Sequence, residues 1–537
     1  MVTLYCDCPE SDSRPDNQSF CAFFGDLFLA WIQPLFLTFQ LMVVSVTLAA
    51  IVGIAGAWAA SNLQAAGRMG RSIALAFLAA MVVSISTPMI LQAAAWEATA
   101  GKFGWMIMTQ TGARAEGLSD YGFFRGLIAC GWIHGLMGAA LVALATWYGV
   151  DRVPRNIRQR ARLDFGPIEA WWRVQLPLAS PWLISSLVAT ALLATTEMTV
   201  VDLYGFRTVA DEFYLFYAVE PSLVSLLMVC FLPLAVMAVL MTWLLVARRR
   251  LVVTRKEAVA FAEGPGLSGP GRGFAALIAI VVIGLVVVIP LGGLAVKVGH
   301  DVEVQQGQLV ATWSLDKTLE RLWNAPAVFA AEYRWTGMIA LGSAIMAVLV
   351  AWPLAALARG ERRWERLLDP LTIVMVLLPG PLVGLLVVRV FQFPIPGFGT
   401  LYQQTLVPTL LVLLVRAVPA AYWILRASYR GLDDSLLESA RLDSSFLRRM
   451  WLIDRPLLKG NLWVAGLASA IVASGDVPAM LPVVPPGVTT VGIRLFGLLH
   501  SGARYQEAAL AIWYLAAVLL ISLVLARQFL SLRVKVK

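Results

Sequence analysis

The sequence predicts an all-α protein that crosses a lipid bilayer about eleven times. Apolar, aromatic and cysteine residues (AVILMFWYC) make up 59% of the 537 residues, and only 14% are charged. Soluble domains contain less apolar material than this. The apolar residues also form long blocks, each near the ~20 residues that a helix needs to span the hydrocarbon core. Together these observations exclude an ordinary soluble globular protein.

The apolar blocks give the positions of the spans to within a few residues. Several contain proline, which membrane helices tolerate because neighbouring helices satisfy the freed backbone groups. The expected spans are 34–60, 72–96, 126–149, 180–200, 222–247, 274–296, 336–358, 370–392, 404–427, 461–482 and 506–527.

The positive charges predict the orientation of these spans, because cytoplasmic loops carry an excess of Lys and Arg. Of the 42 Lys and Arg residues, 29 lie in one set of alternate loops and 11 in the set that includes the N-terminus. We therefore expect the N-terminus outside and the C-terminus in the cytoplasm. Membrane topology and anionic lipid headgroups explain the net charge of +9, so no nucleic-acid partner is expected.

The N-terminal segment gives little information about function. Five cysteines are too few and too scattered for a disulfide framework. Cys6 and Cys8 are either ordinary thiols, free or paired, or a metal-binding pair. The N-terminus shows no basic region and short apolar core ahead of a cleavage site, so we expect the first apolar block to be retained as a span.

A basic stretch rich in Gly, Pro and Ser, residues 248–273, is typical of a flexible linker. It divides the chain into a first half with about five spans, 34–247, and a second half with about six, 274–537. Residues 1–33 form an external N-terminal segment.

The two halves contain an internal repeat. The tetrapeptide Ala-Arg-Leu-Asp occurs at 161–164 and again at 440–443, 279 positions later. The same offset pairs tryptophans, prolines and acids further along, which indicates gene duplication. These pairs are Trp172 with Trp451, Pro177 with Pro456 and Glu197 with Asp476. Six spans separate the two tetrapeptides, so both lie on the cytoplasmic face, as in parallel repeats related by an axis along the membrane normal.

Each repeated tetrapeptide lies in a segment with helical, amphipathic character, at 158–173 and 436–452. We expect Pro177 and Pro456 to end these helices and to begin the next span. One such segment is typical of a helix that rests on lipid. Two equivalent segments on one face favour a twofold partner that binds both.

These segments resemble the EAA loops of the MetI-like permeases of ATP-binding-cassette importers, whose pattern is Glu-Ala-Ala, Gly and, later, Ile-x-Leu-Pro. The second segment keeps Glu438, Ala440 and Pro456, with Ser444 in place of the Gly, and the first keeps Pro177 with Gly166 one place late. The resemblance implies that both segments dock on a cytoplasmic ATPase. The residues it assigns to this coupling are Ala161, Arg162, Leu163, Asp164, Gly166, Trp172, Pro177, Glu438, Ala440, Arg441, Leu442, Asp443, Ser444, Trp451 and Pro456.

Residues 476–509 resemble the last third of the fused, two-domain iron(III)-type permeases, which carry an acid, a Pro-Pro-Gly turn, an Arg and a His-x-Gly element in this order. Asp476, Arg494 and His500 occupy such positions. The resemblance implies ferric iron as cargo, an external solute-binding protein, two copies of an ATPase that binds ATP and Mg, and a bacterial inner membrane. Thiamine and phosphonate importers share this architecture and stay open as alternatives.

Four charged residues are candidates for the translocation pathway or its gate: Glu197, Asp476, Arg416 and Arg494. An acid within a span is costly and lines water or meets a partner. Glu197 and Asp476 therefore either meet a cationic substrate or form gate-stabilising hydrogen bonds or ion pairs, for example with Arg207 or Arg494. Arg416 is expected to pair with an acid or with backbone carbonyls.

His134 and His500 are interpreted as structural, because neither has a His, Cys or acid at ligand spacing in the sequence. No metal site is expected. The chain also contains no phosphate-binding loop, so we expect a transport subunit without cofactor or enzyme activity of its own. A proton-coupled secondary transporter that uses Glu197, Asp476 and Arg416 is the alternative, and a membrane scaffold is a third class.

Overall fold

The computed structural model describes residues 15–101, 124–212, 269–305, 308–433, 444–501 and 504–534, together with single positions between 434 and 443. Nearly all of these residues are helical. The first half contains α1 (Pro15–Leu63), α2 (Gly67–Ser86), α3 (Met89–Ala100), α5 (Gly126–Asp151), α6 (Arg155–Ala170), the π-helical turn η1 (Trp171–Gln175), α7 (Leu176–Thr196) and α8 (Thr199–Leu203).

The second half has more elements and includes the two described strands. Its elements before the second coupling segment are α11 (Gly269–Ile283), η2 (Gly284–Val288), α12 (Ile289–Val298), β1 (His300–Gln305), β2 (Gln308–Trp313), α13 (Leu315–Val328), α14 (Ala330–Gly360), α15 (Arg362–Leu377), α16 (Gly380–Phe391), α17 (Phe398–Gln404) and α18 (Val407–Arg430). After them come α20 (Phe446–Arg449), η3 (Met450–Asp454), α21 (Arg455–Gly475), α22 (Val477–Met480), α23 (Val491–Ser501) and α24 (Arg504–Val534).

The described residues confirm a polytopic, all-α membrane architecture. Among the described residues, nine helices are long and apolar enough to span a bilayer, and α15 with α16 makes a tenth span if the two are counted as one bent span. Each lies at an expected position. The span expected at 222–247 lies outside the described residues.

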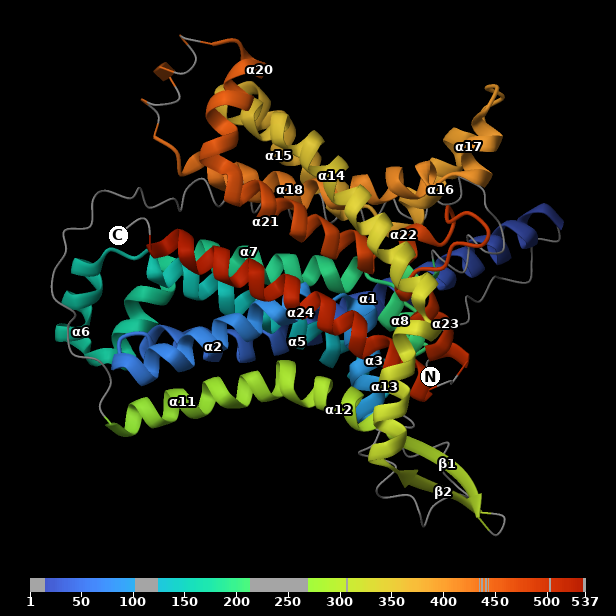
Figure 1. Ribbon diagram of the computed structural model, residues 1–537, viewed down its shortest axis with the longest axis horizontal. Helices are drawn as coiled ribbons and strands as arrows, with labels where there is room; N and C mark the ends of the chain where they lie inside the picture. The colour runs from blue at the N-terminus through green and yellow to red at the C-terminus, as the bar shows by residue number, and fades with distance from the viewer. Residues whose placement is uncertain are drawn as a thin grey trace.

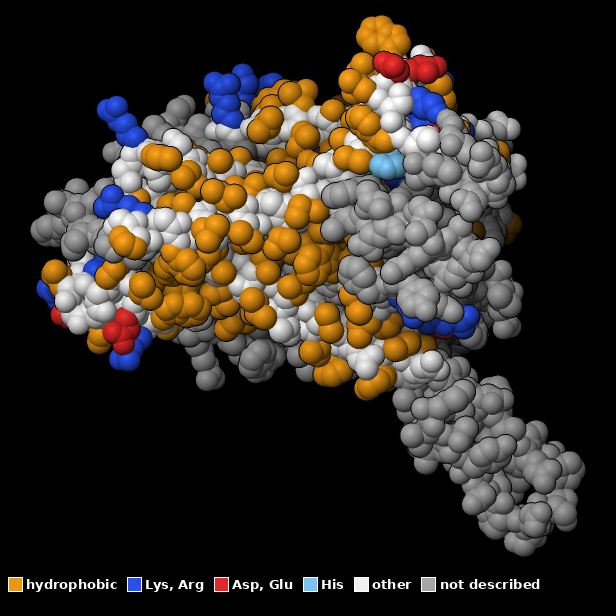
Figure 2. All heavy atoms as spheres, turned by 90° about the horizontal axis from the view of Figure 1, so that it is seen from below, with side chains coloured by type: hydrophobic (Ala, Val, Ile, Leu, Met, Phe, Trp, Pro, Cys, Tyr) orange, Lys and Arg blue, Asp and Glu red, His pale blue; other side chains and the backbone are white. Residues whose placement is uncertain are grey.

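Apolar side chains cover the flank of the bundle. Figure 2 shows hydrophobic side chains over the middle of one long face, with charged side chains gathered toward its ends. Large apolar residues such as Ile51, Leu277 and Leu341 are exposed on different helices. A soluble protein does not expose so large an apolar surface, whereas a lipid-facing surface requires one.

Two of the expected spans are broken in the structure. The helix expected at 370–392 bends by 102° between α15 and α16, and the helix expected at 72–96 ends at Ser86 before α3 begins. Pro379 and Pro88 lie at the two breaks, each with an extended ψ, of 140° and 149°. Proline disfavours the helical conformation in the residue before it, so each chain segment leaves the helix there and restarts after the proline.

Strands β1 and β2 form an antiparallel hairpin that the sequence analysis missed. His300 pairs with Trp313 and Gln305 with Gln308. Figure 1 shows the hairpin beside α13, at the end of the molecule opposite α6 and α20. The hairpin and α13 therefore form an appendage between two spans, α12 and α14.

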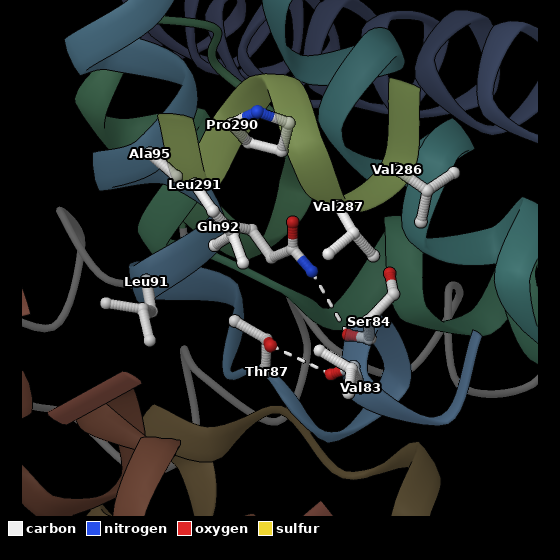
Figure 3. Close-up of a pocket in the computed structure, with 10 residues that line it drawn as sticks. All are labelled: Val83, Ser84, Thr87, Leu91, Gln92, Ala95, Val286, Val287, Pro290 and Leu291. Carbon is white, nitrogen blue, oxygen red and sulfur yellow. Dashed lines mark hydrogen bonds between the residues drawn. The ribbon is translucent and has the colours of Figure 1, made fainter. Parts of the chain in front are cut away.

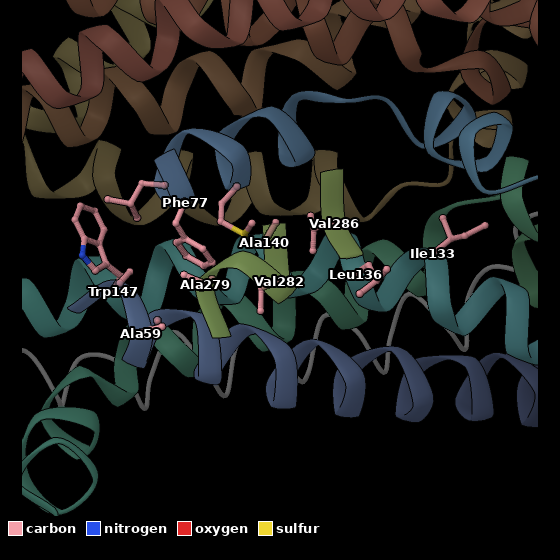
Figure 4. Close-up of a cluster of buried hydrophobic side chains, with 14 of the residues drawn as sticks. Ala59, Phe77, Ile133, Leu136, Ala140, Trp147, Ala279, Val282 and Val286 are labelled. Atoms are coloured by element: carbon pink, nitrogen blue, oxygen red, sulfur yellow. The ribbon is translucent and has the colours of Figure 1, made fainter. Parts of the chain in front are cut away.

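The largest buried cluster joins the two sides of the linker. Phe77 of α2 and Trp147 of α5 pack with Ala279 and Val282 of α11, as Figure 4 shows. These side chains are almost completely buried. The first helix of the second half thus belongs to the packing unit of the first half.

The offset of 279 positions also relates the bounds of the helices. The π-helical turns η1 and η3 begin and end 279 positions apart, and so do α7 and α21. A π-helical turn is rare and often marks a functional position. Its recurrence at equivalent positions therefore adds a structural counterpart to the sequence repeat.

Candidate functional site

The first candidate coupling segment is a broken helix rather than the continuous helix expected at 158–173. Gly166 has φ 75° and ψ 170°, so α6 consists of two helical parts joined at this residue. Only glycine adopts this conformation readily, and Pro167 begins the second part. The glycine therefore sets the angle between the two parts of the segment.

The second segment is broken at the equivalent position, where one helix had been expected over 436–452. Ser445 is extended (ψ 158°) and precedes α20. The offset of 279 positions pairs it with Gly166. Ala440, Arg441 and Asp443 lie outside the described residues. Glu438 is exposed and Ser444 is half-buried.

Three pairs of exposed apolar residues recur at the offset of 279 positions. Leu163 is 74% exposed, and its counterpart Leu442 is 88% exposed. The other pairs are Ile168 with Leu447 and Trp172 with Trp451, and all four of these side chains are exposed. We call the two sets the paired apolar patches. Figure 1 shows α6 and α20 toward the same end of the molecule, so the two helices that carry these residues lie toward one end.

Other predicted coupling residues differ in exposure. Ala161 is buried, Arg162 is half-buried, and Asp164 is exposed. Pro177 and Pro456 are exposed in the first turns of α7 and α21.

Pro177 and Pro456 do not end the helices, contrary to the expectation. Each follows a π-helical turn that continues directly into the next span. In the first half, the N–H of Leu176 bonds to the carbonyl of Trp171. This wider turn accommodates a proline, which has no N–H to donate and would crowd the carbonyl four residues earlier. Each coupling segment is therefore joined to its span without a loop.

A buried polar cluster ties the second coupling segment to the bundle. Asp454 of η3 is 0% exposed. Its carboxylate accepts a hydrogen bond from the Tyr429 hydroxyl at 2.9 Å, and Arg449 Nε lies 3.8 Å from the same oxygen. Tyr429 in turn accepts a hydrogen bond from Trp352 Nε1 at 3.0 Å. The cluster joins the coupling segment to both α14 and α18.

The first half has no charged residue at the corresponding positions. At the offset of 279, Asp454, Arg449 and Tyr429 correspond to Gln175, Ala170 and Val150. All three are buried. The two coupling segments are thus similar in backbone but differ in how they are attached to the bundle.

The two predicted acids have equivalent structural roles. Glu197 follows α7, and its carboxylate accepts hydrogen bonds from the backbone N–H groups of Thr199 and Val200 at 2.8 and 3.0 Å. Asp476 follows α21 and accepts from the N–H of Ala479 at 3.3 Å. Each acid caps the short helix that comes next, which satisfies N–H groups that have no partner within that helix.

Each acid also meets a cationic or titratable side chain from the helix before the coupling segment. His134 Nε2 of α5 lies 3.4 Å from Glu197 Oε2, and Arg416 Nε of α18 lies 2.5 Å from Asp476 Oδ2. Arg416 also donates to the carbonyl of Leu378 at 2.8 Å. The expectation for Arg416 is confirmed, since it pairs with both an acid and carbonyls.

Arg207 and Arg494, which were named as possible partners of the two acids, lie beside other carboxylates. Glu197 does not pair with Arg207 or Arg494: Arg207 lies 3.6 Å from Glu212, and Arg494 lies 2.9 Å from Glu332. His134, which was interpreted as structural, has an acid partner that sequence spacing does not indicate. His134 and Glu197 are 63 positions apart, and only the packing of α5 beside the end of α7 brings them together.

Two threonines form equivalent hydrogen bonds, one within each half of the chain. Thr38 of α1 accepts a hydrogen bond from the N–H of Val209 at 2.9 Å, and Thr336 of α14 accepts from the N–H of Val491 at 2.8 Å. Each threonine also donates to the carbonyl four residues earlier. Val209, in the segment after α8, is thus linked to α1, and Val491, the first residue of α23, is linked in the same way to α14.

An ion pair between described residues connects the two halves of the chain. His500 Nε2 of α23 lies 3.2 Å from Asp202 Oδ2 of α8. The hydrogen bond with Asp202 raises the pKa of His500. His500 therefore has a specific acid partner, which the spacing in the sequence does not indicate.

A small cavity lies where the break between α2 and α3 faces α12. Its volume is about 10 Å³, and Ser84, Thr87 and Gln92 line it together with apolar residues. Figure 3 shows the Gln92 amide bonded to the carbonyl of Ser84. The cavity is large enough for one water molecule and far too small to pass a solute.

Within the described residues, no group of three His, Cys, Asp or Glu side chains is arranged to hold a metal ion. No family model matches the sequence, and no curated protein matches it either. The fold and these features define an α-helical protein that spans a membrane many times.

Proposed function

We propose that the chain is the permease subunit of an ATP-binding-cassette importer, with two parallel, MetI-like repeats fused in one polypeptide. The paired apolar patches carry this proposal. Exposed apolar patches on a rigid support are typical of docking surfaces, and two equivalent patches at one end suit a dimer of identical subunits. The partner is a cytoplasmic ATPase, present in two copies, that binds ATP and Mg.

The attachment of the patches to the spans supports a mechanical role. Because η1 and η3 continue directly into α7 and α21, movement of a docked ATPase subunit shifts a whole helix instead of a slack loop. The far ends of these helices carry Glu197 and Asp476. We propose that the pairs Glu197 with His134 and Asp476 with Arg416 belong to the gate of the translocation pathway.

Ferric iron is the proposed cargo, delivered by an external binding protein, and this assignment depends only on the resemblance of residues 476–509 to iron(III)-type permeases. Importers of thiamine or phosphonate are the alternatives. We place the chain in a bacterial inner membrane with its C-terminus in the cytoplasm, as the loop charges predict.

One observation favours a second candidate, the proton-coupled secondary transporter. His134, which is buried, and Glu197, which is half-buried, form a pair of titratable groups, and such pairs are used as proton relays in membranes. The equivalent pair in the second half contains an arginine, Arg416, in place of the histidine. A proton relay would therefore exist in the first half only. The importer proposal does not require a proton relay in either half.

The test is a charge substitution in each patch, Leu163→Glu and Leu442→Glu, in the full chain reconstituted with the ATPase encoded beside it. We expect each substitution to lower co-purification of the ATPase and ATP hydrolysis stimulated by the binding protein at least tenfold. Met69→Glu is the matched control, because Met69 is also exposed and apolar but lies in α2, outside both segments.

Two results would contradict the proposal. One is that the patch variants bind the ATPase as well as the control does. The other is substrate uptake into vesicles that contain only this chain, a proton gradient and no nucleotide, which would establish the secondary transporter instead.

A further inference from the structure

Helix α13 is held firmly against the ends of other helices. Arg321 donates hydrogen bonds to the carbonyls of Val298 and His300, each at 2.8 Å. Asp301 Oδ2 lies 2.9 Å from Lys317 Nζ and 3.1 Å from Arg321 Nη2. These contacts fix one side of α13 to the last residue of α12 and the start of the hairpin.

The contacts of α13 place it at a membrane boundary. Val298 is the last residue of one candidate span, and Ala330, two residues after α13, begins another. The guanidinium of Arg321 lies 4.0 Å from the ring centre of Tyr505, the first residue of a third candidate span. Three spans therefore begin or end beside α13. Figure 1 shows it crossing the direction of α11 and α12, at the end opposite the coupling segments.

The outward side of α13 is divided into an apolar and a polar strip. Leu315, Leu319 and Trp323 are exposed, and Trp323 is the most exposed of them at 84%. Their spacing of four residues places them in one row along the helix. The next residue after each is polar and exposed, which gives a second row about 100° around the helix axis. The second row consists of Asp316, Glu320 and Asn324.

We propose that α13 lies flat on the bilayer, with Leu315, Leu319 and Trp323 inserted at the boundary between lipid headgroups and acyl chains. An apolar row beside a polar row matches a surface between two phases, because one row faces the acyl chains while the other faces water. Tryptophan is enriched at this depth. Lys317 and Arg321 already contact Asp301, so the polar row presents Asp316 and Glu320, which suits zwitterionic lipids better than anionic ones.

The test measures the depth of spin labels in the full chain, reconstituted in nanodiscs of phosphatidylethanolamine and phosphatidylcholine. The five cysteines are replaced by alanine, and single labels are placed by Leu319→Cys and Trp323→Cys. Glu320→Cys and Asn324→Cys are the matched controls, because they lie on the same helix in the polar row. The readout is the collision rate of the label with oxygen divided by its collision rate with a water-soluble nickel chelate.

We expect this ratio to be several-fold higher at 319 and 323 than at 320 and 324. Equal ratios at the four positions would overturn the proposal. So would labels at 319 and 323 that contact nickel freely in nanodiscs and become protected only when an external binding protein is added, since the row would then be a protein-docking surface. Each labelled variant is compared with the cysteine-free parent by circular dichroism and thermal midpoint, which identifies any variant that has not folded. For such a variant, the label is moved to the neighbouring position of the same row.

Discussion

The pair of Arg416 and Asp476 allows a quantitative prediction about the energetics of the second half. Arg416 Nε lies 2.5 Å from Asp476 Oδ2, and the side chain of Arg416 is only 19% exposed. Asp476→Ala would leave this guanidinium without its acid and would also remove the cap of α22. Breaking a buried ion pair by removing one partner costs about 3–5 kcal/mol, and losing a helix cap costs about 1 kcal/mol.

The structure favours the lower end of this range. Arg416 keeps its hydrogen bond to the carbonyl of Leu378 at 2.8 Å, so the charge retains one partner after Asp476 is removed. We therefore expect Asp476→Ala to lower the free energy of unfolding by about 4 kcal/mol, with about 3 kcal/mol from the broken pair and about 1 kcal/mol from the lost cap. The double variant Arg416→Met with Asp476→Ala has no unpaired charge, and we expect it to lose only about 1 kcal/mol, the contribution of the cap.

The assay is reversible unfolding in mixed micelles as the fraction of denaturing detergent is raised, followed by tryptophan fluorescence. A double-mutant cycle with Arg416→Met, Asp476→Ala and the double variant isolates the pairwise energy, which we expect to be at least about 3 kcal/mol, because the cost of the unpaired guanidinium is absent from the double variant. If the two single substitutions instead add to within about 0.5 kcal/mol, the pair contributes nothing specific and the reasoning is refuted. Asp476→Asn, which keeps an acceptor for the cap, separates the loss of charge from the loss of the cap.

Four further substitutions test other features. Thr336→Val should lower the free energy of unfolding by about 1–2 kcal/mol, since a buried backbone N–H loses its acceptor; an unchanged midpoint would contradict this. Gly166→Ala should cost about 1–3 kcal/mol because φ is positive there, whereas Ser445→Ala, at the equivalent position with negative φ, should be nearly neutral in the same denaturation assay. Since the pKa of His500 is raised, its pair with Asp202 should stabilise the protein fully below the ordinary histidine pKa and lose this effect as the pH rises through the raised value. Asp202→Asn should flatten that part of the pH profile of the thermal midpoint, and a profile that keeps its slope would count against the pair.

Hydropathy placed the spans well because it reports a local property. A block such as 336–358 contains enough apolar residues to predict a span by itself, and α14 includes it. The breaks at Pro88 and Pro379 were not predicted, since membrane helices also tolerate proline without breaking. The hairpin of β1 and β2 was missed because it lies in a polar stretch between spans, where hydropathy gives no signal.

The candidate site was predictable in position but not in its pairings. The repeat located Glu197 and Asp476, and it placed the coupling segments at equivalent positions. It did not predict that His134 meets Glu197, because that contact depends on how α5 packs beside α7. The repeat also suggested equal attachment of the two segments. Asp454 differs from Gln175 in this respect, since its carboxylate bonds to a tyrosine and lies beside an arginine.

The packing of α11 against α2 and α5 bears on how the polypeptide can be divided. Ala279 and Val282 fill part of the core around Phe77. A fragment that stops at the end of the basic linker would therefore lack the α11 side chains that complete its hydrophobic core. A pair of separately expressed fragments would reassemble more readily if the cut fell in the hairpin after α12. The linker at 248–273, which composition suggests as the boundary between the halves, therefore differs from the boundary of the packing unit, which includes α11.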